Sequence, residues 1–129
     1  MKVDMIGIVT ADIQKSLVFY QLLGFQPLTE TTPEYIELAN EGVRLSLNAS
    51  QMVAGVYGYE PKTVGDTIEL AFICETIEEV TAYFMKVKQA GYEIVKEPFH
   101  AFWGQYYTVV KDPDGHTISL FANVSQENV

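Results

Sequence analysis

Two stretches of this sequence carry the same pattern: Gly42-Val43-Arg44-Leu45-Ser46-Leu47 and Gly115-His116-Thr117-Ile118-Ser119-Leu120. They align without a gap at an offset of 73 residues (115 − 42). Each begins with glycine, which supplies the positive φ of a tight turn, and continues with the alternation typical of a half-buried strand. The match indicates an internal repeat, and a repeat of this kind predicts two copies of one supersecondary unit.

The predicted elements that precede the first stretch form one module. A strand over residues 1–9 leads to the helix cap Asp12, and the helix ends at Gly24. Three β runs follow, over residues 25–31, 35–39 and 43–48. The first part of the chain therefore has the order β-α-β-β-β.

The same order returns in the second half of the chain. A strand over 67–74 precedes a helix that begins with a capping box at Thr76 and ends at Gly91. The β runs then cover residues 92–96, 106–111 and 117–121. We expect one α+β domain over residues 1–129, in which a connector over 49–66 joins module one (1–48) to module two (67–124). The alternative is an α+β sandwich without internal symmetry.

Composition limits the partners of the chain. Its 129 residues include 17 acidic and 8 basic side chains, for a net charge of −9. This charge opposes binding to nucleic acid or to an anionic membrane surface. Cys74 is the single cysteine and cannot form an intramolecular disulfide, and no apolar run approaches the roughly 20 residues of a membrane span. Because Asp4 interrupts the N-terminal apolar stretch, we expect no signal peptide and a cytoplasmic protein.

Further motifs resemble one known family. They are Asp12 with Phe19-Tyr20-Gln21-Leu22-Leu23-Gly24-Phe25, then Trp103-Gly104-Gln105, then Asp112-Pro113-Asp114-Gly115-His116. Together with the two repeated strands they resemble the vicinal oxygen chelate superfamily, which includes glyoxalase I, bleomycin-resistance proteins and extradiol dioxygenases. The resemblance covers nearly the whole chain and is closest in character to the bleomycin-resistance branch that lacks a metal.

The resemblance implies a fold and a place for the site. Each βαβββ module would curl into a half-barrel, so that a curved mixed sheet surrounds a cup-shaped cavity with the helices outside. Small members usually form homodimers, which makes a second copy of the chain an expected partner. In metal-using members, the first and last strands of each module each supply one ligand, usually His and Glu respectively.

The residues at those four positions are Met5 and Ser46 in module one, and Glu69 and Ser119 in module two. A thioether, two neutral hydroxyls and one carboxylate suit a divalent ion poorly. We therefore expect no metal and no cofactor, which excludes the iron or manganese chemistry of extradiol dioxygenases. His116 lies in the turn before the last strand and is expected to be solvated, not a ligand.

The expected cavity lining follows from strand alternation and from the aromatic loop before the last hairpin. Arg44, Ser46 and Asn48 share one strand face, which is either a solvated surface or the lining of the cup. Arg44 is also an expected partner for Glu69. The candidate ligand-binding residues are Met5, Arg44, Ser46, Asn48, Glu69, His100, Trp103, Tyr107 and Ser119, with His100 and Trp103 placed in a loop at the rim.

Three functions are compatible with these residues. The first is metal-independent binding of a small amphipathic or aromatic molecule, as in bleomycin-resistance sequestration. The alternative is a glyoxalase-like lyase or isomerase in which Glu69 acts as general base and Arg44, Ser46 and Ser119 stabilise an enolate. The third is a fold kept for a protein interface. We favour binding over catalysis because a dication would stabilise an enolate far better than these side chains.

Overall fold

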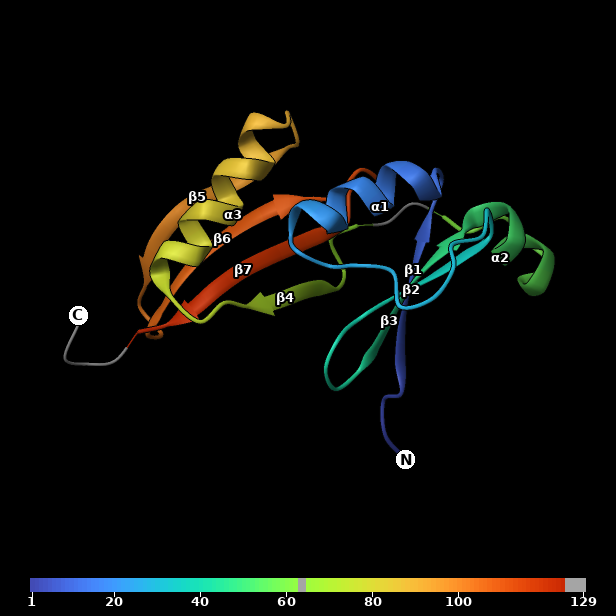
Figure 1. Cartoon of the computed structure of the whole chain (residues 1–129), viewed down its shortest axis with the longest axis horizontal. Helices are drawn as coiled ribbons and strands as arrows, with labels where there is room; N and C mark the ends of the chain where they lie inside the picture. Colours follow the sequence, from blue (N-terminus) through green and yellow to red (C-terminus); the bar gives the residue numbers. More distant parts are fainter. Residues whose placement is uncertain (63–64, 125–129) are drawn as a thin grey trace. The chain divides into compact units, whose positions relative to one another are not determined.

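The computed structural model of the chain describes residues 1–62 and 65–124. The chain divides into two compact units, Met1–Thr63 and Val64–Val129, and each unit has its own sheet (Figure 1). From here on, the names module one and module two refer to these two units and not to the shorter predicted ranges. Both sheets are mixed: each has one parallel strand pair, and its other strand pairs are antiparallel. The predicted α+β fold of two related modules is confirmed.

Module one contains a three-stranded sheet and two helices. Its elements are β1 (Met5–Thr10), α1 (Ile13–Leu22), β2 (Tyr35–Leu38), β3 (Arg44–Ala49) and α2 (Ser50–Tyr57). The strand order is β1-β3-β2, with β1 parallel and β2 antiparallel to β3. The helix α2 falls in the stretch expected to be a connector.

The predicted strand over residues 25–31 is wrong. Only an isolated bridge between Pro27 and Leu38 forms there. The flanking backbone does reach β2, since the Leu28 N–H donates to the Glu37 carbonyl at 2.7 Å and the Ala39 N–H donates to the Gln26 carbonyl at 2.8 Å. These two bonds flank Pro27, whose own nitrogen faces away from β2, so the bridge needs no N–H from the proline.

Module two has the complete βαβββ order. Its elements are β4 (Glu69–Ile73), α3 (Ile77–Gln89), β5 (Ile94–Ala101), β6 (Gln105–Lys111) and β7 (Thr117–Asn123), and the strand order is β4-β7-β6-β5. The parallel pair β4–β7 matches the parallel pair β1–β3 of module one. Among the described residues, no helix has the length and apolarity needed to cross a membrane.

Helix caps predicted from the sequence form as expected. The Asp12 carboxylate accepts a hydrogen bond from the Lys15 N–H at 3.1 Å, and the Thr76 hydroxyl accepts one from the Glu79 N–H at 3.1 Å. The Glu79 carboxylate in turn accepts from the Glu75 N–H at 2.9 Å. These bonds satisfy N–H groups that a helix leaves unpaired at its start, so the helices begin where the sequence places them.

Each module buries one face of its sheet beneath a helix. In module two, α3 places Val80, Phe84 and Val87 in the core, and β7 contributes the alternating residues Ile118 and Leu120 (Figure 1). In module one, α1 contributes Leu17 and Tyr20, and β3 contributes Leu45 and Leu47. Because alternate residues of a strand point to opposite faces, Ser46 and Ser119 lie on the faces away from these helices.

The turn before β7 is built around Asp112, which is almost fully buried. Its Oδ1 accepts the N–H groups of Asp114 at 3.0 Å and His116 at 2.9 Å, and its Oδ2 lies 2.7 Å from His116 Nδ1. The expectation that His116 is merely solvated is therefore wrong. Its hydrogen bond with Asp112 raises the pKa of His116, although partial burial of the ring opposes this shift.

We expect this pair to make stability depend on pH. A histidine whose pKa is raised on folding stabilises the fold fully below its unfolded pKa of about 6.5, and that stabilisation is lost as pH rises through the folded pKa. Replacing His116 with asparagine should therefore cost more unfolding free energy at pH 5.5 than at pH 8.5. Urea unfolding of both proteins at the two pH values measures this, and an equal cost at both would contradict it.

Candidate ligand-binding site

In module one, the pairing of β1 with β3 brings Met5 and Ser46 into contact. The Ser46 hydroxyl lies 3.3 Å from Met5 Sδ, which accepts its hydrogen bond, and Asn48 Nδ2 donates to Ser46 Oγ at 3.0 Å. Ser46 is fully buried, although it lies on the face away from α1. The structure thus brings together three of the predicted site residues and satisfies the buried hydroxyl within the group.

A pocket of about 230 Å³ opens beside this group, between the β1–β3 face and α2. Gly7 forms part of its wall, because a Cβ there would lie 3.1 Å from Asn48 Nδ2 and 3.7 Å from Ser46 Oγ. Apolar side chains dominate the lining, with two polar side chains at one point, as is common in small-molecule sites. The lining residues are Met5, Gly7, Val9, Ser46, Asn48, Met52, Val53, Val56 and Tyr57.

Arg44 has partners within module one. Its guanidinium forms a two-point contact with Glu37, at 2.7 Å from Nη2 and 3.1 Å from Nε, and Nη1 lies 3.1 Å from the Asp4 carboxylate. The hydrogen bond from Arg44 holds the pKa of Glu37 below its ordinary value. Both partners belong to module one, so Arg44 links the start of the central strand β3 to β2 and to the residue before β1.

Tyr35 and Glu37 were missed at the sequence level. Both lie on β2 and face the same way as Asn48 and Ser46, their partners on β3. The Tyr35 hydroxyl donates to Glu37 Oε1 at 3.2 Å and also lies 3.8 Å from Met5 Sδ. Burial, followed by the hydrogen bond with Glu37, raises the pKa of Tyr35. The alternation of Tyr35 and Glu37 with Ile36 and Leu38 was the available signal.

In module two, Glu69, Tyr107 and Ser119 converge, as predicted for three lining residues. The Tyr107 hydroxyl donates to Glu69 Oε1 at 2.8 Å, and the Ser119 hydroxyl donates to Glu69 Oε2 at 2.9 Å. Ser119 is fully buried, whereas Glu69 is exposed. Both carboxylate oxygens therefore have a hydroxyl partner, and the carboxylate is held in one orientation on the face away from α3.

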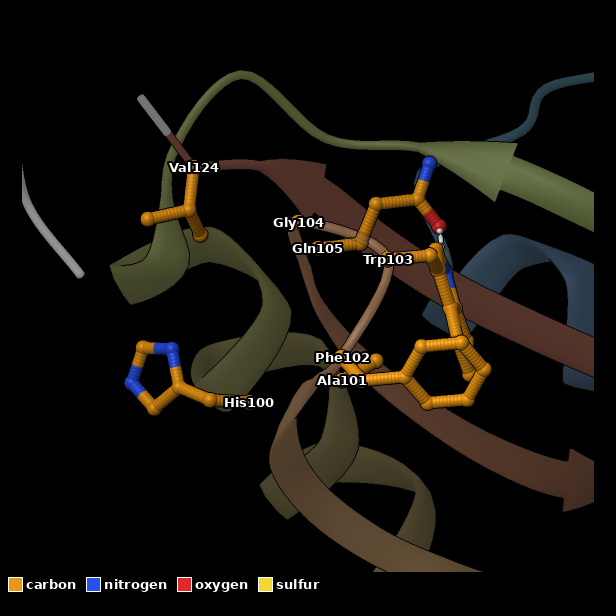
Figure 2. Close-up of a pocket in the computed structure, with 7 residues that line it drawn as sticks. All are labelled: His100, Ala101, Phe102, Trp103, Gly104, Gln105 and Val124. Carbon is orange, nitrogen blue, oxygen red and sulfur yellow. Dashed lines mark hydrogen bonds between the residues drawn. The ribbon is translucent and has the colours of Figure 1, made fainter. Parts of the chain in front are cut away.

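Aromatic rings extend this face toward the β5–β6 turn. Phe99, Phe102, Trp103 and Tyr107, here called the aromatic cluster, meet edge to face. The centroid of Trp103 lies 5.3 Å from Tyr107, 6.3 Å from Phe99 and 4.9 Å from Phe102. The Trp103 Nε1–H donates to Gln105 Oε1 at 2.7 Å, which fixes the indole (Figure 2). These distances and angles are favourable for aromatic pairs.

His100 is placed differently from the sequence prediction. It lies within β5, not in a loop, and pairs with Tyr106, whose ring centroid is 4.9 Å away. Its neighbour Phe99 pairs with Tyr107, so His100 lies on the opposite face of the sheet from the aromatic cluster. The strand continues past its predicted end because a register shift between Lys96 and Phe99 accommodates Pro98.

Both His100 and Trp103 nevertheless border one open cavity of about 630 Å³ at the β5–β6 turn. Figure 2 shows their rings on opposite sides of the hairpin, with His100 on the side of Val124. The cavity therefore wraps around the turn and does not enclose the two rings together. The lining residues are His100, Ala101, Phe102, Trp103, Gly104, Gln105 and Val124.

The four positions that the family resemblance assigns to metal ligands do not fit a divalent ion here. Met5 and Ser46 are hydrogen-bonded to each other, as are Glu69 and Ser119. The only anionic donor among them is Glu69, whose two oxygens already accept hydroxyl hydrogen bonds. Two neutral hydroxyls and a thioether add little affinity for a hard or borderline ion.

A separate group of potential ligand atoms, from Asp112, Asp114 and His116, lies within 4.8 Å. Asp112 uses both of its oxygens to hold the turn before β7. This arrangement explains the group as a structural turn, because the Asp112 carboxylate already pairs with two backbone N–H groups and with His116. We assign it no role in the site.

A family model for the Glyoxalase/Bleomycin resistance protein/Dioxygenase superfamily matches residues 2–120. The chain belongs to this superfamily. The sequence-level resemblance is thereby confirmed at the level of the superfamily, and its two-module fold agrees with the modules seen here. No curated protein matches the sequence.

Several solved structures share the fold. A glyoxalase-related enzyme from Fulvimarina pelagi is similar at 23% identity with a TM-score of 0.85, covering 95% of this chain and 88% of that one. A family enzyme from Burkholderia phytofirmans PsJN is similar at 23% identity with a TM-score of 0.85, covering 96% and 100%. Hypothetical protein SA1046 from S. aureus is similar at 24% identity with a TM-score of 0.82, covering 95% and 94%. At these identities the likeness establishes the fold alone.

We expect the contact between Tyr107 and Glu69 to appear in a tyrosine titration. Burial first, and the hydrogen bond to the Glu69 carboxylate second, raise the pKa of Tyr107 above 10. Glu69→Gln should move that pKa back toward 10 without restoring it fully, because burial remains. NMR titration of labelled tyrosine measures this, with Tyr107→Phe assigning the signal. An unchanged pKa in Glu69→Gln would show that the hydrogen bond is absent.

Proposed function

We propose that this protein binds a small amphipathic or aromatic molecule without a metal ion. The observation that carries the proposal is the pairing of the side chains at the positions that the resemblance assigns to metal ligands. Met5 with Ser46, and Glu69 with Ser119, are joined by hydrogen bonds at 3.3 and 2.9 Å. Side chains that are already satisfied by one another form the floor of an organic binding surface more readily than a coordination sphere.

The surroundings of both pairs support an organic ligand. In module one, the pocket beside Ser46 and Asn48 is walled by methionine, valine and tyrosine side chains and suits a ring-sized apolar group. In module two, the pair Glu69–Ser119 adjoins the aromatic cluster through Tyr107. Apolar walls with a few polar points are typical of sites that orient small molecules.

The alternative, a glyoxalase-like lyase or isomerase with Glu69 as general base, has less support. Each residue expected to stabilise the enolate has another partner: Arg44 contacts Glu37 and Asp4, Ser46 donates to Met5, and Ser119 donates to Glu69. An oxyanion would have to displace these bonds, which weakens the preorganisation that catalysis requires.

We further propose a homodimer that acts in the cytoplasm and contacts neither nucleic acid nor membrane. The net charge of −9 disfavours polyanionic partners. Burial raises the pKa of Cys74 to about 11, which keeps its thiol protonated and unreactive. Exposed apolar side chains such as Ile68 and Ile73 in and before β4 provide area that a second copy could cover.

Native mass spectrometry of protein purified without chelator tests the metal and the dimer together. We expect a mass of two chains with less than about 0.1 equivalents of Zn, Ni, Fe, Mn or Co, because the donor set is too weak. Incubation with excess Zn²⁺ followed by desalting should leave this mass unchanged. A stable mass of one metal per chain or per dimer would overturn metal independence, and a single-chain mass would overturn the dimer.

Binding itself is tested in module one with a panel of substituted aromatic and amphipathic compounds. We expect at least one compound to bind chelator-treated protein, and Gly7→Ala to weaken that binding about tenfold, since the new methyl group occupies the pocket wall beside Asn48. Isothermal calorimetry gives both affinities. A compound that bound only after addition of a divalent ion would contradict the proposal, as would a broad panel with no binder.

Gly55→Ala provides the matched control for this experiment. Gly55 lies in α2, and a Cβ there meets no atom within 4 Å. The variant adds the same methyl group to the same module and should stabilise the helix by about 0.5–1 kcal/mol. Its affinity for the ligand should equal that of the wild type, so that loss of binding in Gly7→Ala alone assigns the pocket.

A further inference from the structure

One face of module two combines the Glu69 carboxylate with the aromatic cluster. We propose that this face selects organic cations, namely molecules that carry a quaternary or protonated ammonium group on an apolar body. This inference rests on the proposed binding function. Four features favour such cations: the aromatic cluster, the Glu69 carboxylate, a lysine whose ammonium group contacts one ring, and the net charge of the chain.

The rings of the aromatic cluster present accessible faces to a cation. Trp103, Phe99 and Tyr107 meet edge to face, with interplanar angles between 79° and 89°. Mutually perpendicular rings present faces in different directions, and the negative face of an aromatic ring attracts a cation. Trp103 is 48% exposed, so part of its surface is open to a ligand. The cluster is therefore an accessible group of π faces and not only a packed core.

The carboxylate supplies the second element. Glu69 is linked to the cluster through Tyr107, whose hydroxyl binds Oε1 and whose ring contacts Trp103 and Phe99. Its two hydrogen-bond donors, Tyr107 and Ser119, are neutral hydroxyls that orient the carboxylate without neutralising it. Within the described part of module two, no lysine, arginine or histidine lies within 4.0 Å of Glu69. An oriented, exposed anion beside aromatic rings is suited to a cationic ligand.

Lys96 shows that this cluster accommodates an ammonium group. Its Nζ lies 5.2 Å from the centroid of Phe99, within the range of a cation–π contact. The lysine belongs to β5, as does Phe99, so it acts as a tethered cation on one ring of the cluster. A ligand ammonium would compete with it or be repelled by it, and removal of its charge should therefore strengthen binding of cations.

The charge of the whole molecule favours the same class of ligand. With 17 acidic and 8 basic residues, the chain attracts cations at a distance and repels anions. An anionic ligand would be repelled by this field and by the Glu69 carboxylate together. The local and long-range electrostatics therefore act in one direction.

A pair of isosteric probes separates charge from shape. Choline and 3,3-dimethylbutan-1-ol differ only in the replacement of the ammonium nitrogen by carbon. Trp103 is the only tryptophan in the chain, so its fluorescence reports binding at the cluster directly. We expect choline to change the emission with an affinity at least tenfold higher than that of the neutral alcohol, and higher in low salt than in high salt.

Variants identify the groups responsible. Glu69→Gln should lower the affinity for choline about tenfold and leave that for the alcohol unchanged, while Phe99→Leu should weaken choline binding and keep an apolar side chain. Lys96→Met should raise the affinity for choline a few-fold. Glu97→Gln is the matched control, because Glu97 is an exposed glutamate of the same module whose partner is Lys88, and choline should bind it as it binds the wild type.

The outcomes distinguish this inference from the broader proposal. Equal affinities for the two probes would overturn cation selection. An unchanged affinity for choline in a Glu69→Gln variant with native circular dichroism would overturn it too. Neither result would contradict the binding of neutral ligands in the module one pocket. A second outcome would also reject cation selection alone. In it, neither probe changes the Trp103 fluorescence, while compounds of the panel bind the protein and lose affinity in Gly7→Ala. Failure of both probes and of the whole panel would reject the proposed function itself.

Discussion

The parallel pairing of the first and last strands in each module places the candidate site. In module one, Gly7 is opposite Ser46, and in module two, Ala71 is opposite Ser119. The residue two positions earlier on the first strand, Met5 or Glu69, then reaches diagonally to the serine hydroxyl. A shift of one residue in either pair would turn these side chains toward the helix. The helix-covered cores, with their alternating leucine and isoleucine residues, prevent that shift.

Much of this architecture was predictable from the sequence because local signals and the repeat agree. Caps at Asp12 and Thr76, with glycines at the helix ends, defined α1 and α3. The errors concern the extent of strand pairing. The run over residues 25–31 makes one bridge to β2, whereas β5 continues past Pro98 through a register shift. Alternation alone does not distinguish these outcomes, because they are set by neighbouring strands. Nor did the short stretch that forms α2 carry a side-chain cap.

The site was predictable to the extent that strand alternation determines it. Alternation and the family resemblance together selected Met5 with Ser46 and Glu69 with Ser119, and the structure brings each pair into contact. The partner of Arg44 was not predictable in this way. In a chain with 17 acidic residues, a long flexible side chain has several carboxylates within reach, and the pairing of β2 with β3 favours Glu37. His100 was misplaced because its face follows from the unpredicted length of β5.

The two modules use equivalent backbone positions for different chemistry. In module one, the pair is a thioether and a hydroxyl, both neutral, and the pocket beside it is walled by apolar side chains. In module two, a carboxylate takes the place of the thioether, and the neighbouring side chains are aromatic. Burial of a neutral pair costs little, so Ser46 can be fully buried against Met5 beside an apolar pocket. A carboxylate cannot be buried so cheaply, which explains why Glu69 remains exposed and why its surroundings are suited to the binding of charge.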